Sequence, residues 1–104
     1  MVFHILFNCS QHNKVMDKKI QKILEEKIQE SMKKRNEITS LVKSLEPVEN
    51  PNVLGHGIIV GRLYNSFYYQ SRRILKRNPT EQEFSEFVKL LQEYKNELSE
   101  ISFS

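Results

Sequence analysis

The sequence predicts an all-α fold of three consecutive helices in an antiparallel arrangement, preceded by a short apolar extension at the N-terminus. Apolar residues recur at steps of three and four in three separate segments, Pro and Asn residues stand between those segments, and no alternation of strand and helix patterns is present. The only strand-like stretch is residues 2–7. With 104 residues and one cysteine, the chain is expected to have an extension of residues 1–13 and a single helical domain of residues 14–104, without an internal disulfide.

The first predicted helix spans residues 14–45. Its apolar positions follow a helical period and are Met16, Ile20, Ile23, Leu24, Ile28, Met32, Ile38, Leu41, Val42 and Leu45. The polar turn at residues 33–37 interrupts this stripe, so we expect the turn to be either exposed or bent. At 1.5 Å per residue this helix would reach roughly 48 Å and the third helix roughly 33 Å, so one end of the first helix should project. Residues 2–7 or a second copy of the protein could cover the projecting stripe, and we expect a homodimer.

The second predicted helix spans residues 51–77, with Asn50 as its N-cap and Pro51 at its first position. Its expected buried side consists of Val53, Gly57, Val60, Leu63, Tyr64, Phe67, Ser71, Ile74 and Leu75. Its expected solvent side consists of Arg62, Asn65, Ser66, Tyr69, Arg73 and Lys76. Each of the three glycines costs about 1 kcal/mol relative to Ala in a helix interior, so the regular helix could begin as late as Ile58.

The third predicted helix spans residues 81–101 and has the clearest start signal. Thr80 is a suitable N-cap, Glu83 follows three residues later, and Pro79 is placed to pack on Phe84. The expected buried stripe is Phe84, Phe87, Val88, Leu91, Tyr94, Leu98 and Ile101, with Leu90 at its edge. The residues expected to face water are Glu86, Lys89, Glu93, Asn96, Glu97 and Glu100. Short linkers favour antiparallel or tightly cornered packing of the helices.

Charge is distributed unevenly over the predicted helices. Residues 51–77 hold five basic and no acidic residues, whereas residues 81–104 hold two basic and six acidic ones. A candidate surface for a partner or a nucleic acid therefore consists of Arg62, Tyr69, Arg72, Arg73, Lys76 and Arg77. Because Arg binds phosphates and Tyr can stack on bases, contact with RNA or DNA is one interpretation. Pairing with the acidic third helix, or contact with a protein, is the interpretation we favour.

Glycines near the start of the second helix have two interpretations. Gly57 and Gly61 are spaced to let another backbone approach closely, which is the role we favour. Alternatively, Gly55, His56 and Gly57, followed by Gly61, could form an anion-binding turn at a helix start, although the spacing fits neither the dinucleotide-binding fingerprint nor the P-loop. His56 is expected to be a hydrogen-bonded structural residue rather than a pH-sensitive or ligand-binding group.

No metal, cofactor or catalytic site is expected. His4, Cys9 and His12 include a spacing that occurs in zinc sites, but a fourth ligand is missing. The acidic residues of the third helix fall on its solvent side and form no catalytic pair, so we do not expect an enzyme. Residues 1–7 are apolar but cover only about a third of the ~20 residues that a membrane span requires, and they lack the basic region of a signal peptide. We therefore expect a cytoplasmic protein without a membrane partner.

The leading hypothesis is a small helical interaction or adaptor module that binds another protein and itself. The projecting first helix or the basic side of the second helix would make the contact. The alternative is a helical nucleic-acid-binding protein that uses the basic residues of the second helix. An enzyme of unknown type is the third hypothesis.

Overall fold

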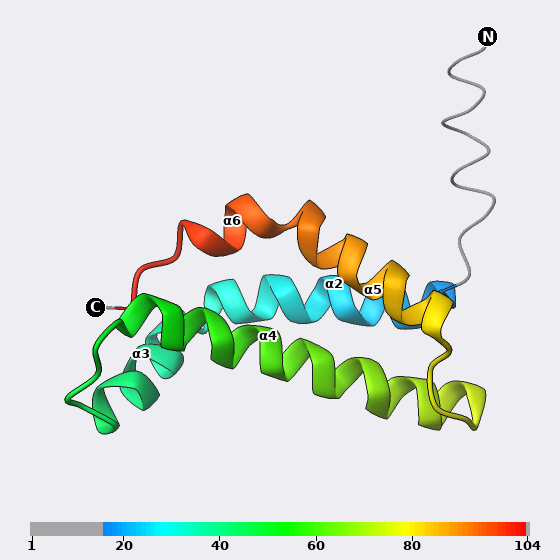
Figure 1. The fold of residues 1–104 in the computed structure, drawn as a ribbon, viewed down its shortest axis with the longest axis horizontal. Helices are drawn as coiled ribbons and strands as arrows, with labels where there is room; N and C mark the ends of the chain where they lie inside the picture. The colour runs from blue at the N-terminus through cyan, green and yellow to red at the C-terminus, as the bar shows by residue number, and fades with distance from the viewer. Residues whose placement is uncertain (1–15, 104) are drawn as a thin grey trace, which may run out of the picture.

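The computed structural model describes residues 16–103, and within them the chain is helical without any strand, which confirms the all-α class. The helices are α2 (Lys18–Lys33), α3 (Arg35–Ser44), α4 (Pro51–Gln70), the π-helical turn η1 (Ser71–Leu75), α5 (Glu81–Glu93) and α6 (Lys95–Ser99) (Figure 1). The predicted extension of residues 1–13, with His4, Cys9 and His12, lies outside the described residues.

The first predicted helix is not continuous. Asp17 caps α2 by accepting hydrogen bonds from the backbone N–H groups of Lys19 and Ile20, at 2.8 and 3.2 Å. The helix then breaks at Lys34, inside the polar turn for which the sequence allows a bend. The residues from Lys33 to Glu37 are all exposed, so no core contact on that turn holds α2 and α3 on one axis.

The second and third predicted helices also end earlier than expected. Asn50 caps α4 through the Val53 N–H at 3.1 Å, so the helix is regular from Pro51 despite its glycines. It becomes π-helical at Ser71 and stops at Lys76, whose backbone is left-handed at a φ of 62°. The third predicted helix breaks at Tyr94, which separates α5 from α6.

Figure 1 shows the chain reversing direction after α3 and again after η1, so that α4 runs back along α2 and α3. The α5–α6 arm (residues 81–99) then returns toward the N-terminal end of α4. The core lies between these segments and contains Met16, Ile20, Leu24, Ile28, Ile38, Val42, Ile59, Leu63, Phe67, Phe87, Leu90, Leu98, Ile101 and Phe103.

The buried side of α4 differs from the expected one. It consists of Gly55, Ile59, Leu63, Ser66, Phe67 and Gln70, of which the sequence analysis placed only Leu63 and Phe67 in the core. Val53, Val60 and Tyr64 were expected to be buried and are instead exposed. The reason is that α4 has one charged residue among its 20 and apolar residues on every side, so no polar stripe marks which side faces water.

A smaller rotation affects α5. Phe84 was expected in the buried stripe but is exposed, whereas Leu90, expected at the edge of that stripe, is buried. Phe87 is buried as predicted and stacks on Phe67 of α4, with ring centroids 4.7 Å apart and planes 7° from parallel. This stack fixes α5 against the C-terminal half of α4.

Candidate functional site

The most unusual surface in the described residues is one side of α4, which we name the outer face of α4 and define as Val53, Gly57, Val60, Gly61 and Tyr64. The three side chains on it are 65%, 39% and 46% exposed, in that order. Both glycines are exposed as well. The face carries no charge, although charged side chains normally cover the solvent side of a surface helix.

No other part of the described chain occupies the space in front of the two glycines of the outer face. Apart from the adjacent residues and backbone of its own helix, a Cβ placed on Gly57 or on Gly61 lies more than 4 Å from every atom of the described residues. The close approach that the sequence analysis expected at these two glycines is therefore not made within the described chain. It is made instead at Gly55, where a Cβ would overlap the ring of Phe103.

The N-terminal part of α4 holds the C-terminal residues in place. The Phe103 N–H donates to the Asn52 side-chain oxygen at 2.7 Å, and Nε2 of His56 lies 3.0 Å from the carbonyl oxygen of Ile101. Because a carbonyl only accepts, Nε2 must carry the proton. The His56 and Phe103 rings also meet edge to face, with centroids 5.4 Å apart. His56 thus has the structural hydrogen bond that the sequence analysis favoured.

An apolar groove of about 330 Å³ borders the outer face at Val60. It lies between α4 and the α5–α6 arm and is lined by His56, Val60, Val88, Leu91, Gln92, Lys95, Leu98 and Ser99. At the other end of the outer face, Tyr64 meets Phe84 edge to face, with centroids 6.4 Å apart. The exposed apolar surface therefore continues from α4 onto α5.

The basic residues of the second predicted helix do not form one free surface. Arg62 donates to Glu30 of α2 at 2.8 Å. Arg77 makes a two-pronged pair with Glu83 of α5, at 2.8 and 3.0 Å. Of these two arginines, only Arg77 pairs with the acidic third predicted helix. The Arg62 hydrogen bond lowers the pKa of Glu30, and the Arg77 hydrogen bond lowers the pKa of Glu83.

Of the five basic residues of the second predicted helix, the other three are exposed and form no ion pair within residues 16–103: Arg72, Arg73 and Lys76. The guanidinium of Arg72 lies 5.8 Å from the centre of the Tyr68 ring, a cation–π distance. Arg73 donates to the side-chain oxygen of Gln70 at 2.9 Å. Tyr69, on the same stretch, is 56% exposed. The predicted basic surface is thus reduced to a small cluster at the C-terminal end of α4.

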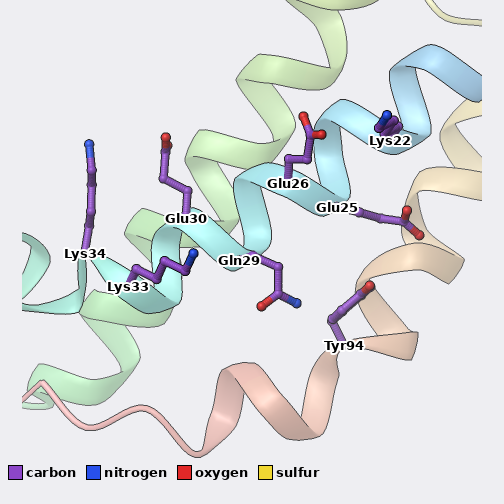
Figure 2. Close-up of a pocket in the computed structure, with 8 residues that line it drawn as sticks. All are labelled: Lys22, Glu25, Glu26, Gln29, Glu30, Lys33, Lys34 and Tyr94. Carbon is purple, nitrogen blue, oxygen red and sulfur yellow. The ribbon is translucent and has the colours of Figure 1, made fainter.

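A second, polar cleft of about 550 Å³ was not predicted from the sequence. Figure 2 shows its lining, which comes from α2 and from the break between α5 and α6: Lys22, Glu25, Glu26, Gln29, Glu30, Lys33, Lys34 and Tyr94. Burial, followed by the charges of Glu25, Glu97 and Glu93, raises the pKa of Tyr94. The lining carries three lysines and three glutamates, so the cleft has no excess of either sign of charge.

The described residues contain no cluster of three His, Cys, Asp or Glu side chains that could hold a metal ion. None of their helices is both long enough and apolar enough to span a membrane. Comparison of the chain with protein-family models, with curated proteins and with solved structures finds no match. No related protein therefore indicates a role for the outer face of α4 or for the basic cluster.

Proposed function

We propose that this protein is a small helical interaction module that binds another protein chain on the outer face of α4. One observation carries the proposal. The single charged residue of α4, Arg62, is paired with Glu30, and yet the opposite side of this almost uncharged helix is left exposed by residues 16–103. A helix that is apolar all round is normally covered all round, and contiguous exposed apolar surface typically marks an interaction site.

The shape of the surface supports a protein partner over a small ligand. The outer face is exposed apolar surface next to an apolar groove, and a partner helix can lie along this face with its own side chains in the groove. Tyr64 and Phe84 supply exposed aromatic area next to the groove, and aromatic residues dominate the binding energy of many interfaces. The remaining helices support α4 from its buried side.

Site-specific photo-crosslinking in the organism's own cells tests this proposal. A benzophenone amino acid at Val60 should form adducts with a protein at a defined mass, because Val60 lies on the outer face. The same amino acid at Tyr69 is the matched control, since Tyr69 is exposed on the opposite side of α4. Equal labelling from both positions, or no protein adduct from Val60, would contradict the proposal.

Nucleic-acid binding is the second candidate function. It is favoured by a cluster of three exposed cations that form no ion pair in the described chain, Arg72, Arg73 and Lys76, near the exposed ring of Tyr69. A salt titration against mixed RNA and DNA separates the candidates, because binding that depends on phosphates weakens linearly with log salt. Loss of binding in Arg72→Glu/Arg73→Glu with an intact fold would support this second function, whereas no binding at low salt would remove it.

A further inference from the structure

We infer that the chain bound on the outer face of α4 is a second copy of this protein, whose α4 crosses the first antiparallel between Gly57 and Gly61. This inference rests on the proposed function and adds the identity and orientation of the partner. It is carried by the shape of the face, by the charges at its two ends and by the absence of charge on the face itself.

The outer face is complementary to itself in shape. In an antiparallel two-fold crossing between the two glycines, Gly57 of each copy faces Gly61 of the other, so the two backbones can approach closely. The same symmetry places Tyr64 of one copy opposite Leu54 of the other, which sets a large ring beside a smaller, half-buried side chain. Small residues thus lie at the centre of the crossing and larger ones lie on both sides of it.

The charges that flank α4 select the antiparallel orientation. Glu46 and Glu49 precede the helix without any basic residue between them, and both are exposed. The exposed cations Arg72, Arg73 and Lys76 follow the helix. An antiparallel crossing brings the acidic end of each copy toward the basic end of the other and also opposes the two helix dipoles, whereas a parallel crossing brings like charges together.

The outer face can be buried against a second copy without burying a charge. No ionised group lies on it, so the crossing desolvates apolar surface and glycine backbone rather than charge. We expect a weak dimer with a dissociation constant on the order of 10–100 μM.

Sedimentation equilibrium of the full chain tests the contact. Gly57→Leu/Gly61→Leu should raise the dissociation constant at least 10-fold, since the new side chains hold the two backbones apart. The fold should persist because a Cβ at either position meets no neighbouring atom in the described chain, and a melting temperature at or above that of the wild type verifies this. The matched control Gln82→Leu/Ser85→Leu, on an exposed side of α5, should leave the constant unchanged. An unchanged constant in the glycine variant overturns the inference.

Cysteine cross-linking tests the orientation. In a Cys9→Ser background, Val53→Cys and Asn65→Cys are prepared as separate proteins, mixed and treated with a short bis-maleimide. An antiparallel crossing predicts that the mixture forms mainly the hybrid dimer, because position 53 of one copy faces position 65 of the other. Mainly like-with-like dimers would overturn the antiparallel arrangement.

The outcomes also separate this inference from the proposed function. A wild-type protein that stays monomeric at high concentration, while the benzophenone at position 60 labels a different protein, overturns the second copy as partner and leaves the interaction module standing. A monomer that dimerises only after residues 1–13 are removed likewise overturns the inference, because the face would then be covered by its own chain. Failure of position 60 to label any protein overturns the proposed function itself.

Discussion

Position 55 must be a glycine because the packing leaves no room there for a side chain. The ring of Phe103 occupies the space where a Cβ would lie, and Phe103 is completely buried. We expect Gly55→Ala to lower the free energy of unfolding by about 1–3 kcal/mol, the usual cost of overpacking a core. Gly57→Ala should instead raise it by up to about 1 kcal/mol, because Ala is the better helix former. Urea unfolding measures both, and equal effects would contradict this assignment.

Glu83 links stability to pH at the start of α5. It accepts from Arg77 at 2.8 Å and from the Thr80 N–H at 2.8 Å, while the Glu83 N–H donates back to the Thr80 hydroxyl at 3.1 Å. The hydrogen bond from Arg77, above all, lowers the pKa of Glu83 in the folded state. The contribution of Glu83 to the free energy of unfolding is therefore fully present above the unfolded-state pKa. It is lost as the pH falls through the lower folded-state pKa.

From this sign we predict that Glu83→Gln destabilises the protein by about 1 kcal/mol at neutral pH, the typical value of a helix cap. The variant and the wild type should approach each other in stability as the solution is acidified, because both side chains are then neutral. Thermal unfolding over a pH series measures the two curves. A difference between them that does not shrink in acid would show that the charge of Glu83 is not the cause.

The end of α4 and η1 depends on one unfavourable backbone conformation. Lys76 is the only residue other than glycine with a positive φ in the described chain. A left-handed conformation costs about 1–2 kcal/mol for a residue with a Cβ, and glycine avoids most of this cost. We expect Lys76→Gly to raise the free energy of unfolding by about 1 kcal/mol, measured by chemical denaturation. Lys76→Ala is the control, and an equal gain in both variants would assign the effect to the lost charge instead.

The starts of the second and third predicted helices could be predicted from the sequence because capping is local, whereas the first helix begins at Lys18 after the Asp17 cap and not at residue 14. Asn50 with Pro51, and Thr80 with Glu83, lie where the sequence analysis placed them, and the reciprocal bonds of the second cap are both formed. The break at Lys34 falls in a turn whose polarity allowed it. The break at Tyr94 could not be predicted in this way, because Tyr94 belongs to the apolar stripe that the sequence predicts to be buried. The position of this break depends on how the α5–α6 arm packs against the other helices.

The candidate surfaces were harder to predict than the helices. The rotation of α4 could not be determined, because a helix with apolar residues on every side offers several equivalent buried faces. The partner of Arg62 proved to be Glu30, which lies in α2 and not in the acidic third segment that the charge pattern suggested. The packing of Phe103 against Gly55 could not be predicted, because Phe103 follows the last segment with a helical period and no pattern there indicates packing.

Across the whole molecule, the α5–α6 arm is fastened to α4 near both of its ends. Phe87 stacks on Phe67 near one end, and the segment that follows the arm inserts Phe103 against Gly55 at the other. We predict that Phe103→Ala accelerates amide hydrogen exchange in residues 95–101, because it removes the second attachment, while α2 keeps its protection. Val53→Ala, on the outer face, is the control and should leave the exchange of the arm unchanged. Uniform acceleration along the chain would indicate global destabilisation instead of a local release.

The same two attachments leave the outer face of α4 uncovered by residues 16–103, and this open face is the central feature of the described structure. Amide NMR spectra recorded over a dilution series examine it most directly, since they report association residue by residue without any substitution. The account predicts concentration-dependent shifts that cluster around Val53, Gly57, Gly61 and Tyr64. Shifts that cluster instead at residues 72–77, or spectra that do not change with concentration, would contradict self-association through this face.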